Sequence, residues 1–233
     1  MGNSAYVVAS DILTAEHVCL AIGGRELLAD ATIRMARGSI TALLGRNGAG
    51  KSLLLQCIFG TRAATECDVH VNGVLLRNAY TIPRLMNYLP QRPFLPQDVR
   101  VGALMRQYRV PQEKLLAEYP ELEAYIHTPI RELSPGYERL LSVLLVLYAD
   151  SRFTMLDEPF AHIEPMYAER LLASLQRQRY RKGIIITDHR YEPLLQVADT
   201  IYLLKEGRSV YIREVEDLVV HGYLATLNSL ITR

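Results

Sequence analysis

Short apolar runs alternate with segments of helical period along most of the chain. The runs ITALL (40–44), RFTMLD (152–157) and GIIIT (183–187) are apolar enough to be buried on both faces. Strands of this kind, separated by helical patterns, are typical of a mainly parallel sheet covered by helices. The pattern therefore predicts an α/β fold in which these three strands lie side by side.

Both ends of the chain carry a more β-like pattern. HVCLAI (17–22), ATIRM (31–35) and DVHVNG (68–73) alternate in part and predict a small antiparallel sheet beside the main one. Near the other end, IYLL (201–204) and SVYI (209–212) flank a KEGR turn. They predict a hairpin closed through Gly207 at an edge of the sheet.

The period becomes helical between residues 92 and 133. Apolar residues recur there at spacings of three and four, namely Leu115, Leu116, Tyr119, Leu122, Tyr125 and Ile126. The next helix is apolar nearly all round from Leu140 to Leu147, so we expect it to pack under this insertion. We predict a single domain over 1–233 with a helical subdomain at about 92–150.

Composition and net charge favour a protein with one sizeable core and give no support for a nucleic-acid-binding protein. The chain has 233 residues, of which 49% are hydrophobic, and this is long enough to bury one sizeable core. A net charge of +1 gives no electrostatic argument for a nucleic-acid partner. The basic run RQRYRK (177–182) could be taken for a nucleic-acid patch, but we interpret it as the end of a helix begun near Pro165, where positive charge is favourable.

Cysteine use and the lengths of the apolar runs favour a cytosolic protein. Cys19, Cys57 and Cys67 are odd in number and lack metal-ligand spacing, so we expect buried, reduced thiols. The most apolar run, 140–149, is well below the ~20 residues that a membrane span needs. The segment MGNSAY shows no targeting signal.

A glycine-rich block directly follows the run ITALL. GRNGAGKS matches GxxxxGKS without departure and precedes an apolar LLL. In such a block, backbone N–H groups turn inward around phosphate oxygens, the lysine reaches the β and γ phosphates, and the serine hydroxyl ligates Mg²⁺. A plain strand-to-helix turn is the alternative, which this context disfavours. The expected phosphate-binding residues are Gly45, Asn47, Gly48, Gly50, Lys51 and Ser52.

Two acids lie at the end of the run RFTMLD, Asp157 as its last residue and Glu158 directly after it. Asp157 and Glu158 stand at the carboxyl end of an expected buried strand, where an open parallel sheet places its ligands. Asp157 is expected to hold Mg²⁺, directly or through water, opposite Ser52. Glu158 is expected to orient or deprotonate the water that attacks the γ phosphate. The alternative is a strand end whose acids cap a helix.

Four further motifs decide between the classes of phosphate-binding protein. Gln91 stands in NYLPQRP, LSPGY occupies 133–137, AHIE occupies 161–164, and His189 follows GIIIT in ITDHR. Together with GRNGAGKS and MLDE, these motifs stand in the order found in ABC ATPases. The sequence resembles the nucleotide-binding domain of that family across almost the whole chain. The resemblance implies a P-loop fold with an N-terminal antiparallel β subdomain and a helical insertion.

The same resemblance implies roles for individual residues. GRNGAGKS is similar to the Walker A motif, and MLDE is similar to Walker B with its catalytic glutamate at Glu158. Gln91 matches the glutamine that senses Mg²⁺, as a ligand, and the membrane partner. His189 matches the histidine that contacts the γ phosphate. AHIE matches the D-loop, with Glu164 where the family usually has aspartate.

LSPGY matches the family signature LSGGQ, which completes the ATP site of the opposite subunit in a head-to-tail dimer. Ser134 and Gly136 are retained, whereas Pro135 replaces a glycine and Tyr137 replaces the glutamine. Proline removes one N–H group, and a lost contact to phosphate would cost about 1.5–3 kcal/mol. We therefore predict weakened closure of the dimer.

Two further departures concern the nucleotide. Ile22 stands where an aromatic residue usually stacks on adenine, which predicts looser ATP binding and weaker discrimination of ATP from GTP. Leu53 replaces a common threonine and removes a possible donor to the α phosphate. With Pro135, these departures predict a slow or partner-dependent ATPase.

The resemblance implies the Mg²⁺-dependent ATPase subunit of an ABC transporter, which closes on ATP as a homodimer or with a related chain. Separate membrane subunits would form the pore, and this chain would lie in the cytoplasm, peripherally on the inner face of the cell membrane. DEPF (157–160) and ITDH (186–189) are similar to subunits of branched-chain amino-acid importers and lipopolysaccharide exporters. The alternatives are an ABC switch or assembly factor without transport, and a regulatory subunit that binds ATP without turning it over.

Overall fold

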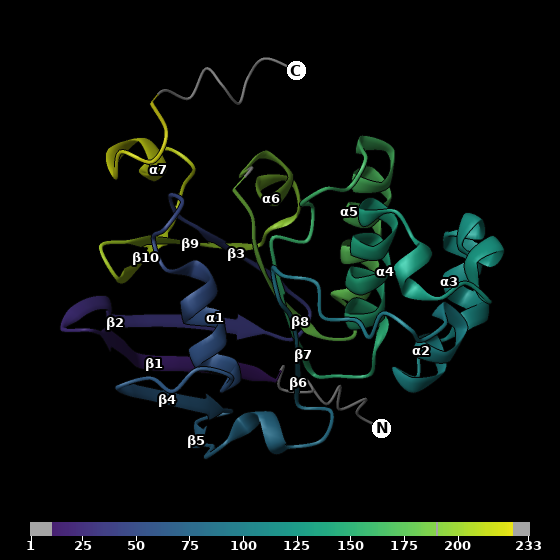
Figure 1. Ribbon diagram of the computed structural model, residues 1–233. Helices are drawn as coiled ribbons and strands as arrows, with labels where there is room; N and C mark the ends of the chain where they lie inside the picture. The colour runs from purple at the N-terminus through teal and green to yellow at the C-terminus, as the bar shows by residue number, and fades with distance from the viewer. Residues whose placement is uncertain (1–10, 190, 226–233) are drawn as a thin grey trace, which may run out of the picture.

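A computed structural model describes residues 11–189 and 191–225, and it contains two β-sheets flanked by helices (Figure 1). The larger sheet has the strand order β10-β9-β3-β8-β7-β6. Its strands are β3 (Ile40–Leu44), β6 (Met86–Leu89), β7 (Phe153–Asp157), β8 (Gly183–Thr187), β9 (Thr200–Lys205) and β10 (Arg208–Ile212). All neighbours are parallel except β9 and β10. The three predicted central strands do lie side by side, and the predicted hairpin forms one edge.

The smaller sheet is antiparallel, as the alternating N-terminal pattern predicts. Its strand order is β2-β1-β4-β5, and the strands are β1 (Ile12–Ile22), β2 (Arg25–Ala36), β4 (Glu66–Val71) and β5 (Val74–Leu75). The hairpin of the larger sheet is tied to it, because the backbone N–H of Ala29 donates to the carbonyl of Gly207 at 2.8 Å. The two sheets therefore meet along β2 and β10.

Helices cover both faces of the larger sheet. The α-helices are α1 (Lys51–Phe59), α2 (Val101–Gln107), α3 (Gln112–Glu118), α4 (Pro135–Tyr148), α5 (Pro165–Gln178), α6 (Tyr191–Val197) and α7 (Asp217–Val220). Short 3₁₀ turns occupy η1 (Ala79–Thr81), η2 (Pro120–Tyr125) and η3 (Ile130–Glu132). None of the described helices is long and apolar enough to cross a membrane.

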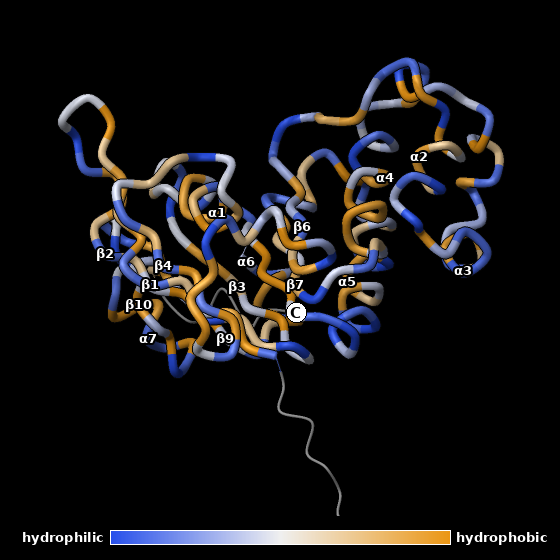
Figure 2. The backbone as a smooth tube through the Cα atoms, turned by 90° about the horizontal axis from the view of Figure 1, so that it is seen from below, coloured by the Kyte–Doolittle hydropathy of each residue, from blue (hydrophilic) through white to orange (hydrophobic). Residues whose placement is uncertain are grey.

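Two apolar cores lie on opposite faces of the larger sheet. Leu43, Met155 and Ile185 point toward α1 and the small sheet, and Ala42 and Ile186 point toward α4 and α5. This division follows from the period of two along each strand. The buried stretch of α4 joins the second core together with α2 and α3, so it packs under the insertion as expected. Figure 2 shows α2 and α3 as a lobe to one side of the strands.

The apolar period from Leu115 to Ile126 falls in helical elements, as predicted. It is divided between two of them, because α3 ends at Glu118 and a 3₁₀ turn begins at Pro120, whose ring breaks a helix. The cysteines are free, but only Cys57 is buried, whereas Cys19 and Cys67 are half-buried.

The basic run after α5 places one of its residues inside the protein. The helix ends at Gln178, so Arg177 lies in its last turn, and Lys182 lies beyond it with 3% of its surface exposed. The ammonium of Lys182 donates to the carbonyls of Leu147 and Ala149 at 2.8 and 2.6 Å, and to the hydroxyl of Ser151 at 3.2 Å. It therefore satisfies orphan carbonyls at the C-terminal end of α4.

Raising the pH from 7 to 9 is expected to stabilise the native chain relative to Lys182→Met. Burial and the nearby charge of Arg181 lower the pKa of Lys182 from 10.5 to about 7. At a pH between these two pKa values, the unfolded chain binds a proton at Lys182 that the folded chain does not bind. The free energy of unfolding therefore rises with pH over this range, and the stability gained in this way is lost as the pH falls through 7. Urea unfolding of both chains at pH 7, 8 and 9 measures the difference. Parallel pH profiles would contradict it.

Candidate functional site

The glycine-rich block forms the loop between β3 and α1, at the carboxyl end of a central strand. The loop passes close to β9, because a Cβ atom on Gly45 would lie 2.8 Å from the carbonyl oxygen of Leu204. Gly50 has φ +101°, a left-handed conformation that favours glycine, and it immediately precedes the first residue of α1. The sequence thus folds here into a tight turn at the start of α1, and Gly48, Gly50 and Ser52 line a cavity beside it. Backbone N–H groups in such a turn favour an anion.

Lys51 is only 6% exposed, and its ammonium donates to the carbonyls of Gly45 and Arg46 at 2.7 and 3.3 Å. Burial lowers the pKa of Lys51, while the nearby carboxylates of Glu158, Asp157 and Asp188 raise it. The loop therefore holds this side chain against its own backbone, with acids on the other side.

Asp157 is the last residue of β7, and it lies beneath the cavity rather than in its wall. It is 1% exposed, and its two carboxylate oxygens accept from the hydroxyls of Thr187 and Tyr88 at 2.8 and 3.1 Å. Burial and the Asp157 charge raise the pKa of Tyr88, which keeps that hydroxyl a donor. Sequence reasoning did not identify Tyr88 or Thr187, because each faces Asp157 from a neighbouring strand.

Glu158 follows in a left-handed conformation, with φ 49°. Its backbone N–H donates to the carbonyl of Thr187 at 2.9 Å, which holds this strained turn. Its carboxylate accepts from the side-chain amide of Gln91 at 2.8 Å and lies 4.0 Å from Nδ1 of His189. Nδ1 of His189 is 3.2 Å from the Asp188 carboxylate. The structure therefore brings Gln91, Glu158 and His189 together, from three separate segments of the chain.

These residues line an open cavity of ≈ 480 Å³ together with the glycine-rich loop. The lining residues are Asn47, Gly48, Gly50, Lys51, Ser52, Leu53, Gln91, Glu158 and His189. Most of the predicted site residues thus meet at one place. Gly45 and Asp157 lie beneath this wall, and Ser134 and Gly136 are outside it.

The polar groups that line this cavity suit a phosphate chain with Mg²⁺. Lys51 and the loop N–H groups provide cationic and hydrogen-bonding partners for phosphate. Ser52, Gln91 and Glu158 present oxygen atoms, the ligand type that Mg²⁺ prefers, and Mg²⁺ takes few protein ligands because phosphates and waters supply the rest. Among the described residues, no cluster of three or more His, Cys, Asp or Glu forms a metal site made of protein alone.

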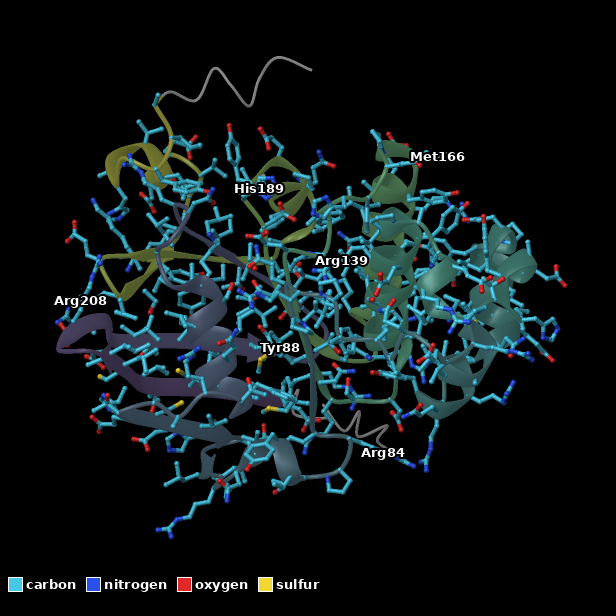
Figure 3. The ribbon with its side chains drawn as sticks, viewed as in Figure 1. Arg84, Tyr88, Arg139, Met166, His189 and Arg208 are labelled. Atoms are coloured by element: carbon cyan, nitrogen blue, oxygen red, sulfur yellow. The ribbon has the colours of Figure 1, made fainter. Side chains whose placement is uncertain are left out.

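Arg139 on α4 holds the site together, and sequence reasoning did not find it. Its guanidinium donates to the carbonyls of Asp157 and Glu158 at 2.6 and 2.8 Å, and to the carbonyl of Pro90 at 2.8 Å. Burial lowers the pKa of Arg139, and the surrounding carboxylates raise it. Figure 3 shows Arg139 between the strands and α4, below His189. It therefore fixes the segments before Gln91 and around Glu158 to one helix.

The segment LSPGY forms the N-terminus of α4. Ser134 is the N-cap, and its hydroxyl accepts from the backbone N–H of Tyr137 at 3.2 Å. Pro135 takes the first helical position, where its fixed φ is favourable and its missing N–H is one that the helix itself would not use. Gly136 approaches the D-loop, because a Cβ atom there would lie 3.0 Å from the carbonyl of His162.

Tyr137 packs against the neighbouring helices. Its ring centroid lies 4.8 Å from that of Tyr125, and its hydroxyl is 2.9 Å from the hydroxyl of Tyr167 on α5. The residue that replaces the family's glutamine thus ties the start of α4 to both the insertion and α5.

Ile22 ends β1 and is 47% exposed. The C-terminal segment instead places an aromatic residue near the loop, because Tyr223 lines a cavity together with Arg46 and Asn47. The side chain of Arg46 donates to the carbonyl of Gly222 at 3.1 Å. The segment after α7 is therefore part of the outer wall of the glycine-rich loop.

Comparison with known proteins agrees with this geometry. The family model described as "ABC transporter" matches residues 28–161, which contain the glycine-rich block, Gln91, LSPGY and the acid pair. A probable branched-chain amino acid transport ATP-binding protein, LivF, from Archaeoglobus fulgidus is 30% identical over 88% of this chain and 93% of its own length. The hemin import ATP-binding protein HmuV from Bordetella parapertussis is 28% identical over 91% of this chain and 90% of its own.

A solved structure described as the ATP binding subunit of an ABC transporter has the same fold. It superposes with a TM-score of 0.79 at 23% identity, over 94% of this chain and 97% of that one. The family match, the similar sequences and the similar fold therefore all point to the same class of protein as the residues around the cavity. The chain belongs to the ABC transporter family, as one of its ATP-binding domains.

Proposed function

We propose that this chain binds and hydrolyses ATP to power separate membrane subunits, on whose cytoplasmic face it sits. The observation that carries the proposal is the convergence of Gln91, Glu158 and His189 on the cavity that contains Lys51. ATP-binding subunits of this family are ATPases in general. The relatives are named as subunits of transport and import systems, which supports a partner in the membrane.

Each site residue has a role that its position supports. The loop N–H groups and Lys51 would bind the β and γ phosphates, and Ser52 and Gln91 would hold Mg²⁺, which neutralises phosphate charge when bound. Asp157 would act on the metal through water, because it lies beneath the cavity wall. Glu158 would accept a proton from the attacking water, and His189 would orient the γ phosphate.

The position of Ser134 and Gly136, in the LSPGY segment, supports a role for them in the ATP site of another subunit. Ser134 and Gly136 do not line the cavity of their own chain. If they bind nucleotide, they therefore do so in a second copy or a related chain. We propose a head-to-tail dimer, weakened because Pro135 removes one N–H from the helix N-terminus that would face the phosphate.

The rate of Mg²⁺-dependent ATP hydrolysis by the purified chain, measured against protein concentration, tests this proposal. We expect a rate that rises faster than linearly and that Pro135→Gly increases about tenfold, since a charge-assisted hydrogen bond contributes about 1.5 kcal/mol or more. Absence of hydrolysis in both chains at all concentrations would instead favour a regulatory subunit. Membrane co-purification of native partners separates transport from an assembly role.

Ile22→Tyr is expected to tighten ATP binding about 5- to 150-fold, because stacking on a base contributes about 1–3 kcal/mol. Titration of Mg²⁺–ATP and Mg²⁺–GTP into both chains, followed by calorimetry, measures the two affinities. Val74→Tyr is the matched control, since Val74 is also an exposed strand residue of the small sheet. No change in ATP affinity, or the same change in the control, would show that adenine does not reach β1.

A further inference from the structure

A second cavity, of ≈ 450 Å³, lies at the opposite end of the larger sheet from the ATP site. Its walls include residues 148–151, which precede β7, and residues 180–182, which precede β8. It therefore sits at the amino ends of the parallel strands. In Figure 3, Arg84, which forms an ion pair with Asp150 of this wall, lies at the lower end of the molecule, far from His189. The two cavities share no lining residue.

Positive charge dominates this second cavity. Arg37, Arg109, Arg181 and Lys182 line it, and Asp150 is the single acid among the described residues of its wall. The Asp150 carboxylate already lies 3.3 Å from the guanidinium of Arg84. The wall therefore has an excess of cations that its own acid does not balance.

The three arginines keep donors available. Within the described ranges, no carboxylate lies in ion-pair distance of Arg109 or Arg181. Arg37 is 3.9 Å from the Asp11 carboxylate, which the guanidinium of Arg152 binds more closely, at 2.5 and 2.9 Å. Guanidinium groups match the oxygen pairs of phosphate and carboxylate groups and bind them in a bidentate way.

Buried polar groups complete the wall. Gln178 lines the cavity and is 2% exposed, yet its side chain forms no hydrogen bond with any described residue. Its amide atoms are not among the fully buried side-chain atoms that lack a partner, so they reach the cavity, where a bound molecule can replace water as their hydrogen-bond partner. The three donors of Lys182 are used by Leu147, Ala149 and Ser151, so this residue contributes its charge but no free donor.

We infer that this cavity binds a small multivalent oxyanion, held by the guanidinium groups of Arg37, Arg109 and Arg181 and by the buried amide of Gln178. The volume suits a small molecule bearing phosphate or carboxylate groups. Burial and the charge of Arg181 lower the pKa of Lys182, and a bound anion would stabilise the charged form of this side chain.

Calorimetric titration of the full chain with pyrophosphate, and separately with citrate, tests the inference. The titrations use a Lys51→Met background in EDTA, so that the ATP site contributes little. We expect saturable binding of one anion per chain, weakened at least tenfold by Arg109→Gln, by Arg181→Gln and by Gln178→Leu. Arg131→Gln is the matched control and should leave the affinity unchanged, because this exposed arginine is outside the cavity. Thermal unfolding of each variant confirms that it is folded.

Two results would overturn the inference. One is binding that is not saturable, or that the control weakens as much as the cavity variants do. The other is binding only to vesicles of phosphatidylglycerol, lowered by the same cavity variants while neither free anion titrates, because the site would then serve a membrane surface. A preference between pyrophosphate and citrate identifies phosphate or carboxylate as the ligand group.

Discussion

Replacing Glu158 with glutamine is expected to lower the rate of ATP hydrolysis by about 10²- to 10⁴-fold, the usual contribution of a general base. The amide cannot accept the proton of the attacking water. Its oxygen can still accept from the side-chain amide of Gln91, which lies 2.8 Å from the native carboxylate, so the cavity keeps its shape. ATP binding should therefore survive the change.

Release of phosphate under single-turnover conditions measures the chemical step, and calorimetry with Mg²⁺–ATP measures binding. Glu169→Gln is the matched control, because this exposed acid of α5 does not line the ATP cavity. A native rate in Glu158→Gln would assign the proton transfer elsewhere. Loss of ATP binding in the same variant would instead show that Glu158 holds the cavity open.

Arg139→Met is expected to lower the free energy of unfolding by about 3 kcal/mol or more, since each unpaired buried polar group costs about 1–3 kcal/mol. Methionine fills similar space without donors. It would leave the carbonyls of Pro90, Asp157 and Glu158 without the guanidinium that they bind at 2.6–2.8 Å. Loss of the buried cation offsets part of this cost, because its own desolvation is unfavourable.

Urea unfolding measures the stability of Arg139→Met. Arg106→Met on α2 is a suitable control, because Arg106 is exposed and surface changes usually fall within about 0.5 kcal/mol. We also expect slower ATP hydrolysis, since Arg139 positions the segments that carry Gln91 and Glu158. Stability equal to that of the control would mean that the three carbonyls find other donors.

The glycine-rich loop and the two central acids were predictable, because their signals are local. A buried strand followed by GxxxxGKS specifies a loop at a helix N-terminus, and two acids at a strand end lie at the same edge of a parallel sheet. The helical character of the insertion was also predictable from its apolar period, and the division at Pro120 follows from the proline ring, which ends α3 and starts a 3₁₀ turn.

The effect of Pro135 depends on contacts beyond its own segment. The sequence shows that an N–H is missing from LSPGY, and the structure places this residue at the first position of α4. Whether the missing donor matters depends on what faces the helix N-terminus in a dimer, which no pattern within one chain specifies.

The sequence by itself determined the α/β class, the three central strands and the glycine-rich loop between β3 and α1, because periodicity and turn chemistry act over a few neighbouring residues. Tertiary structure decided the contacts between distant segments. The pairs Gln91–Glu158 and Tyr88–Asp157 are separated by 67 and 69 positions, and Arg139 reaches Pro90 across 49. The cationic cavity arises in the same way, since Arg37, Arg109 and Arg181 meet only when the helical insertion packs against the sheet. Such contacts depend on how whole helices and strands pack against one another, which the periodicity of a short segment does not specify.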